Sequence, residues 1–181
     1  MASSKLEIDK GNILFVASGR LVYQKGFERL LKIFNELDND NLKLYILGDG
    51  PMKHDLSRII KKLNIESKAF LVGFCENPWK WYANADVFLL PSHWEGMSNA
   101  ALESLSCGTP IIATASSGGI SELAKEANIG DVIVVDDEDL FKIEMSAAVK
   151  KNINQLPRQS MLPKNYRLDN VVLQIEEWLN E

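Results

Sequence analysis

Two kinds of hydrophobic pattern alternate along the chain. Six short runs are almost continuously apolar, as expected for parallel strands that are covered on both faces. They are NILFVAS (12–18), LKLYILG (42–48), AFLVGF (69–74), DVFLLPS (86–92), TPIIATA (109–115) and DVIVV (131–135). The spacing from one run to the next suits right-handed helical crossovers. The pattern therefore predicts an α/β fold with a doubly wound parallel sheet of about six strands.

Helices are predicted from apolar residues at helical spacing and from residue types that commonly begin or end helices. Residues 27–37 and 52–63 each place five apolar residues on one helical stripe. A third helix is predicted to begin at Ser98, a residue type that caps helices, and to end at Gly108 before Pro110.

The two ends of the chain differ from this alternation. Residues 1–11 are polar and predict a linker, whereas 12–150 form the predicted α/β domain. Residues 151–165 contain two prolines and no periodicity, which predicts a loop. A last helix is expected at 166–181, with an apolar face that includes Trp178 and that we expect to lack part of its cover.

Composition narrows the function classes. The chain has 181 residues, 46% hydrophobic and 25% charged, which fits one soluble globular domain. Its formal net charge of -5 argues against broad binding to nucleic acid or to an anionic membrane, and no apolar run is long enough to span a bilayer. Cys75 and Cys107 form no disulfide framework or metal pattern, so we expect reduced packing residues in a cytoplasmic protein.

In open α/β sheets, ligands bind at the carboxyl ends of the strands, so the residues after each strand carry the chemistry. Arg20 and Lys25 follow the first strand and could converge on a phosphate, although each alone is more simply a solvated charge. As exposed loop charges, both are expected to contribute little to folding stability. After the third strand, backbone groups at Val72, Gly73 and Phe74 could meet a flat base. A plain turn with a core phenylalanine is the alternative.

The stretch EGMSNAALE places two carboxylates, Glu95 and Glu103, on either side of a predicted helix N-terminus. The free N–H groups and the dipole of a helix N-terminus favour an anion, and carboxylates accept hydrogen bonds from sugar hydroxyls. A diphosphate with a hydroxyl-bearing ring on each side fits this layout. The stretch therefore indicates a nucleotide-sugar.

A family resemblance rests on these residues. The E-x7-E stretch followed by CGTPIIAT resembles the retaining glycosyltransferases of the GT4 (group 1) family, as do GRLVYQKG, LYILGDGP and YANADVFLLPS. The resemblance covers roughly residues 12–135 in the right order. It implies the Rossmann-like, carboxy-terminal half of a GT-B enzyme, which binds the donor. No segment here corresponds to the acceptor-binding amino-terminal domain of such enzymes, so we expect a fragment of a longer transferase that is inactive when isolated.

The resemblance also implies roles for individual residues. Arg20 and Lys25 would hold the donor diphosphate, Glu95 would contact the transferred sugar, and Glu103 would bind the ribose hydroxyls. Arg20, Lys25 and Glu95 would carry catalysis, with Glu95 orienting the donor sugar rather than acting as a base. Backbone groups of Gly96, Met97, Ser98 and Asn99 would touch the phosphates, and those of Val72, Gly73 and Phe74 the base.

The expected reaction is transfer of a hexose or N-acetylhexosamine from a nucleoside-diphosphate sugar, with UDP as the default, to an acceptor hydroxyl. Bacterial surface polysaccharide or lipopolysaccharide synthesis is the expected setting, by family analogy, at the inner face of the cell membrane. No cofactor and no metal are expected. The expected partners are the nucleotide-sugar and the missing acceptor domain. Any peripheral contact with a membrane would be made by that missing domain. No nucleic-acid partner is expected.

Other readings remain open at this point. A GT-B sugar-nucleotide epimerase would share the donor site, and a non-catalytic nucleotide-binding or interaction module would share the fold. An NAD-dependent oxidoreductase would need the fingerprint G-x-G-x-x-G. The segment that begins at Gly48 lacks it, because Lys53 stands where the last glycine is required. His54 and His93 are more simply a solvated helix residue and a loop residue than catalysts.

Overall fold

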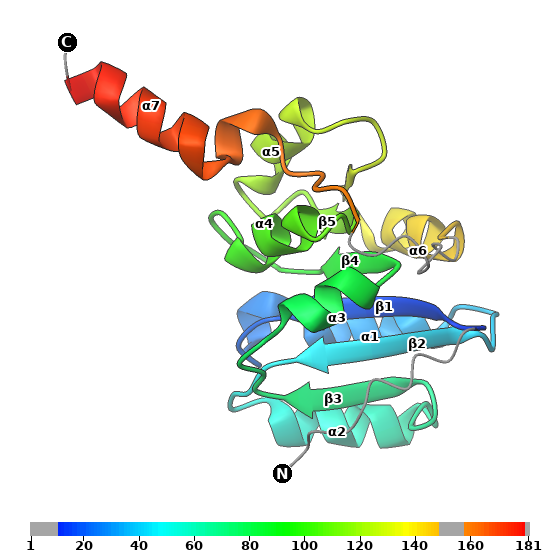
Figure 1. Ribbon diagram of the computed structural model, residues 1–181. Coiled ribbons are helices and arrows are strands. Elements are labelled where there is room, and N and C mark those ends of the chain that lie inside the picture. The colour runs from blue at the N-terminus through cyan, green and yellow to red at the C-terminus, as the bar shows by residue number, and fades with distance from the viewer. Residues whose placement is uncertain (1–10, 149–157, 180–181) are drawn as a thin grey trace.

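The structure is a computed structural model that describes residues 11–148 and 158–179, and for residues 174–179 the backbone alone (Figure 1). Nearly all of the predicted linker at 1–11 and part of the predicted loop at 151–165 lie outside these ranges. Throughout the described ranges, no helix combines the length and the apolar character needed to cross a membrane.

A six-stranded, all-parallel sheet forms the centre of the molecule, and all six predicted strands are confirmed. The strands are β1 (Ile13–Ser18), β2 (Leu42–Leu47), β3 (Ala69–Gly73), β4 (Val87–Leu90), β5 (Ile111–Thr114) and β6 (Val132–Val135). Their order across the sheet is β3-β2-β1-β4-β5-β6. Successive strands are added on one side of β1 up to β3 and on its other side from β4 onwards, so the carboxyl ends of β1 and β4 border the crevice where such sheets bind ligands.

Helices cover both faces of the sheet, which explains why the strands are apolar on both sides. The helices are α1 (Phe27–Asn35), α2 (Lys53–Lys62), α3 (Trp79–Asn84), α4 (Asn99–Ser106), α5 (Ile120–Glu126), α6 (Glu138–Ser146) and α7 (Leu168–Leu179), with short 3-10 turns η1 (Tyr23–Lys25) and η3 (Lys164–Tyr166). One buried cluster joins α1, α2 and α6 to the sheet, and a second cluster joins α3, α4 and α5 to the opposite face (Figure 1). The fold is therefore Rossmann-like, as predicted.

The predicted helices are confirmed with shifted ends. The stripe at 27–37 is fully buried in α1 and the turn that follows it, whereas in α2 only Leu56 and Ile60 are fully buried. Gly108, at φ 71, ends the helix that follows Ser98. Helices α3, α5 and α6 were not predicted.

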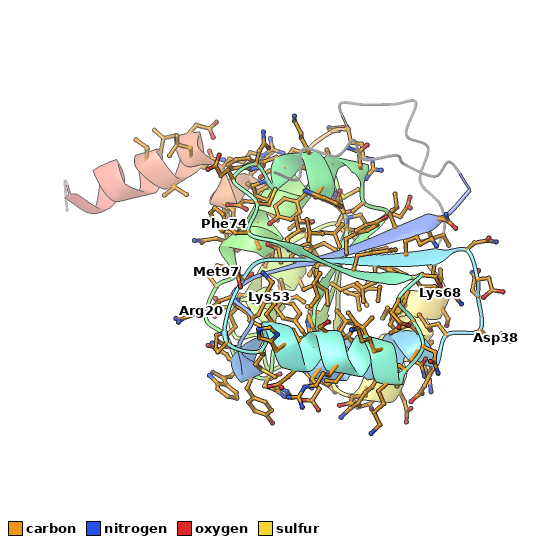
Figure 2. All side chains as sticks on the ribbon, turned by 90° about the horizontal axis from the view of Figure 1, so that it is seen from below. Arg20, Asp38, Lys53, Lys68, Phe74 and Met97 are labelled. Atoms are coloured by element: carbon orange, nitrogen blue, oxygen red, sulfur yellow. The ribbon has the colours of Figure 1, made fainter. Side chains whose placement is uncertain are left out.

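The loops after β1 and β2 approach each other at the carboxyl edge. Gly48 has φ +132, and a Cβ atom there would lie 1.9 Å from the carbonyl oxygen of Gly19. Figure 2 shows Arg20, Phe74 and Met97 at this edge, while Asp38 and Lys68 lie at the opposite edge. The sheet thus brings the loops that were predicted to carry chemistry to one end of the molecule.

The carboxy-terminal segment is tied back to the domain before α7 begins. Arg158 donates to the carbonyl of Ala85 at 2.6 Å, and the Met161 amide donates to the carbonyl of Leu105 at 2.8 Å. Helix α7 then extends away from the sheet (Figure 1). The side chain of Trp178 lies outside the described residues, so the expected partly uncovered face remains a prediction.

Candidate nucleotide-sugar site

A cavity of about 430 Å³ opens at the carboxyl edge of the sheet. The ends of β1 and β2, the segment after β3, and helices α3 and α4 contribute its walls. Four residues predicted to bind the donor line it together: Arg20, Phe74, Asn99 and Glu103. Predicted site residues from two separate loops and one helix therefore share one cavity.

Arg20 and Phe74 present unused binding groups to this cavity. The Arg20 side chain is exposed, and none of the described carboxylates pairs with its guanidinium. Phe74 is 76% exposed and follows Gly73, which has φ +89. The alternative of a core phenylalanine is wrong, because the ring lies on the surface beside the cavity. A cation and a free aromatic face suit a phosphate and a base, respectively.

Helix α4 begins beside the same cavity. Ser98 occupies the predicted N-cap position and is buried, but its side chain makes no capping hydrogen bond. Its carbonyl accepts hydrogen bonds from the amides of Ala101 and Leu102 at 3.1 and 3.2 Å. Asn99, at the first turn, is exposed and lines the cavity, and Gly96 and Met97 are exposed just before it.

Lys25 and Glu95 form an ion pair with each other, which the sequence did not predict. Their side chains are only 17% and 11% exposed, so Lys25 is not the exposed loop charge that we expected. Neither residue lines the cavity. The pair nevertheless lies next to it, because a Cβ atom on the cavity residue Gly19 would be 3.0 Å from Cε of Lys25. The expectation that Lys25 adds little to stability rested on an exposed position and therefore no longer follows.

A buried serine fixes the orientation of Glu95. The Ser92 hydroxyl donates to Glu95 Oε2 at 2.8 Å, so each carboxylate oxygen has its own partner. The Ser92 carbonyl in turn accepts from Thr114 Oγ1 at 2.6 Å and Ser116 Oγ at 3.0 Å. Groups whose neighbours are fixed in this way are preorganised for binding.

Glu103 has a buried partner that the sequence analysis missed. Tyr82 is 1% exposed, and its hydroxyl makes hydrogen bonds with Ser18 and Glu103. Burial raises the pKa of Tyr82 to about 12, an effect that the hydrogen bond with Ser18 opposes. Burial also raises the pKa of Glu103, and the hydrogen bond from Tyr82 lowers it in part. The Glu103 carboxylate is thus held at the cavity wall as an acceptor.

The remaining candidates have simpler environments. His54 is exposed on α2, as predicted. His93 is half-buried in the loop after β4, where burial and then the Arg29 charge lower its pKa. Cys75 and Cys107 are free and half-buried. Among the described residues, no cluster of three or more histidine, cysteine, aspartate or glutamate side chains could hold a metal ion.

Comparison with known proteins decides the family. The family described as "Glycosyl transferases group 1" matches residues 2–167. The chain belongs to this family. An uncharacterized glycosyltransferase of Methanocaldococcus jannaschii is 39% identical over 129 residues, which are 70% of this chain and 32% of that protein. An N-acetylgalactosamine-N,N'-diacetylbacillosaminyl-diphospho-undecaprenol 4-alpha-N-acetylgalactosaminyltransferase of Campylobacter jejuni is 39% identical over 121 residues, 67% of this chain and 33% of that protein.

Solved structures support the same fold. The lipopolysaccharide outer core galactosyltransferase WaaB in its apo form superposes with a TM-score of 0.78 at 21% identity, over 93% of this chain and 49% of that one. Anabaena HepE in complex with UDP superposes with a TM-score of 0.71 at 19% identity, over 94% and 49% of the two chains. The chain spans about a third of the length of these two curated group 1 relatives and about half of these two solved chains.

Proposed function

We propose that the chain is the donor-binding domain of a retaining glycosyltransferase. The transferase would move a hexose or an N-acetylhexosamine from a UDP-sugar to an acceptor hydroxyl and release UDP. The observation that carries this proposal is the shared cavity at the edge of the sheet, which is lined by the Arg20 cation, the exposed ring of Phe74 and the Glu103 carboxylate. These three groups match the phosphate, base and ribose of one nucleotide.

In the proposed complex, the base lies at Phe74 and the ribose hydroxyls donate to Glu103. Tyr82 keeps the Glu103 carboxylate directed at the ribose, because its hydroxyl is buried and bonded to that carboxylate. The diphosphate lies between Arg20 and the first turn of α4, where the positive end of the helix dipole favours an anion. UDP is favoured as the nucleotide because the solved relative HepE has been captured with it.

The transferred sugar would extend from the diphosphate towards Glu95. The carboxylate orients the sugar through its hydroxyls. Lys25 lies between Glu95 and the cavity residue Gly19. Its ammonium group would also interact with the β-phosphate. As the glycosidic bond breaks, negative charge grows on the departing diphosphate, and Arg20, Lys25 and the start of α4 stabilise it without a metal. The attacking hydroxyl would belong to the acceptor molecule, which an acceptor domain would bring to the cleft.

Named relatives suggest the setting. They include an amylovoran biosynthesis glycosyltransferase of Erwinia amylovora and a lipopolysaccharide core biosynthesis glycosyltransferase of Rhizobium meliloti. We therefore propose that the whole enzyme acts in bacterial surface polysaccharide or lipopolysaccharide synthesis, and we propose for it a cytoplasmic location at the inner face of the membrane.

A melting-temperature screen tests the proposal. UDP, GDP, ADP and their glucose conjugates are added separately to this chain and to Arg20→Ala. Lys68→Ala, which removes a cation at the opposite edge (Figure 2), is the matched control. A nucleotide at 100 times its Kd adds about 2.7 kcal/mol, which raises Tm by roughly 5 to 10 °C for a chain of this size. We expect UDP to do this for the parent and Lys68→Ala, and much less for Arg20→Ala.

Two outcomes would contradict the proposal. An unchanged Tm with every nucleotide would favour a non-catalytic interaction module. The second outcome concerns the enzyme with its acceptor domain. If it converts the UDP-sugar in the absence of an acceptor and inverts the configuration at a sugar carbon, it is an epimerase.

A further inference from the structure

Three aromatic residues gather on the surface next to the Lys25–Glu95 pair. Tyr23 stacks on His93 with ring centroids 4.5 Å apart and planes at 15°, and Trp94 lies 5.9 Å from Tyr23 and 6.2 Å from His93. Tyr23 is 60% exposed and Trp94 is 53% exposed. We call these three residues the aromatic ledge. None of them lines the donor cavity.

The ledge is held in place by backbone contacts rather than by covering residues. The His93 amide donates to the carbonyl of Gln24 at 2.8 Å, and the Gln24 side chain donates to the carbonyl of Trp94 at 3.0 Å. Arg29 donates to the carbonyls of Pro91 and Ser92, which fixes the chain just before His93. Adjoining exposed aromatic rings on a backbone fixed by hydrogen bonds provide a preorganised surface of the kind that binding sites use.

The position of the ledge relates it to the reaction centre. Trp94 immediately precedes Glu95, and Tyr23 lies two residues before Lys25. The charged groups that act on His93 are Arg29, Glu28 and Glu138, which belong to α1 and α6. Helices α3 and α4, on the other face of the sheet, line the donor cavity. The ledge and the cavity therefore flank the Lys25–Glu95 pair from two different sides.

We propose that the aromatic ledge binds a pyranose ring of the acceptor saccharide. This inference rests on the proposed glycosyl transfer. A pyranose has an apolar face of C–H groups that packs on an aromatic ring, and a rim of hydroxyl groups that needs hydrogen-bond partners. Tyr23 and Trp94 supply the apolar surface, while the Gln24 amide and the exposed Glu138 carboxylate supply polar groups beside it.

Other occupants fit this surface less well. A lipid chain would remove water from the neighbouring charges of Glu28, Arg29 and Glu138, which costs free energy. The donor sugar, attached to the diphosphate, would reach Glu95 from the cavity side. An acceptor sugar on the ledge would approach the same carboxylate from the opposite side, so that donor and acceptor meet at Glu95.

Saturation-transfer NMR tests the proposal on this chain with UDP present to fill the cavity. The probes are the methyl α-glycosides of glucose, galactose and N-acetylglucosamine. We expect saturation to reach the ring C–H protons of at least one probe. Trp94→Ala and Tyr23→Ala should weaken its affinity about tenfold, the scale of one aromatic contact. Trp94→Phe keeps a ring and should retain binding. Trp79→Ala, which removes a 49% exposed tryptophan on α3, is the matched control.

Saturation of no probe, or saturation that Trp94→Ala leaves unchanged, would overturn the proposal. The Tm shift with UDP, recorded on the same samples, separates this failure from failure of the proposed function. If UDP binds and no glycoside does, the ledge assignment alone is wrong. If Trp94→Ala instead weakens UDP-glucose relative to UDP, the ledge holds the donor sugar and the acceptor assignment is wrong.

Discussion

Replacing Lys25 by alanine should destabilise the fold by about 2 kcal/mol, in addition to any effect on catalysis. Truncating one partner of a fully buried ion pair costs about 3 to 5 kcal/mol, whereas exposed pairs contribute about 0.2 to 1 kcal/mol. The Lys25 and Glu95 side chains are 17% and 11% exposed, and Ser92 would still satisfy one oxygen of the Glu95 carboxylate. The cost should therefore fall between these limits, and Tm should drop by roughly 4 to 8 °C for a chain of this size.

Urea unfolding of Lys25→Ala, Glu95→Ala and the double variant measures the pair directly. Because the two side chains bind each other, the double variant should lose less stability than the sum of the single variants, by about 1 to 2 kcal/mol. Arg20→Ala is the control: it removes a nearby exposed cation without a carboxylate partner among the described residues and should change stability by less than about 0.5 kcal/mol. Additive losses, or a Lys25→Ala variant as stable as Arg20→Ala, would refute the reasoning.

Three further predictions concern the same edge of the sheet. Arg20→Ala in the enzyme with its acceptor domain should lower turnover by roughly two to three orders of magnitude in a steady-state assay, the scale of one preorganised stabiliser; near-normal turnover would remove Arg20 from the site. Burial raises the pKa of Glu103, so UDP affinity should fall as the pH drops through that raised pKa and the carboxylate is protonated. Calorimetric titrations with UDP at several acidic pH values should show this loss of affinity in the parent and not in Glu103→Gln. Gly48→Ala should lower Tm, because its Cβ atom would lie 1.9 Å from the Gly19 carbonyl oxygen at a φ that alanine disfavours; a parental melting curve would contradict the close contact.

The strands could be predicted because each is buried on both faces, which leaves a continuous apolar run in the sequence. Helices α3, α5 and α6 gave weaker signals. Helix α3 has six residues and α5 has seven, too few to show a helical period clearly. Helix α6 did carry a start signal, since the Asp137 side chain accepts a hydrogen bond from the Leu140 amide at 2.8 Å. Reading aspartate followed by two acidic residues as a helix start would have found it.

The sequence predicted which residues lie at the site but not which of them contact one another. Each strand end could be located in the sequence, so Arg20 and Glu103 were expected at one edge. Lys25 and Glu95 are 70 residues apart, and their contact depends on how two loops fold over Gly19. No local pattern encodes such a contact. Tyr82 lay in a motif that was used only for the family resemblance, and its role became visible once its hydroxyl was seen beside Glu103.

Titration calorimetry with UDP and UDP-glucose on the parent, Glu103→Ala and Glu95→Ala tests the division of labour between the two glutamates most directly. Losing a charged hydrogen-bond partner costs about 1 to 3 kcal/mol, so Glu103→Ala should weaken UDP by roughly 5- to 150-fold. Glu95→Ala should leave UDP affinity unweakened, because its proposed partner is the sugar, and should remove any additional affinity for UDP-glucose. Equal weakening of UDP by both variants would contradict the assignment of ribose to Glu103 and of the transferred sugar to Glu95.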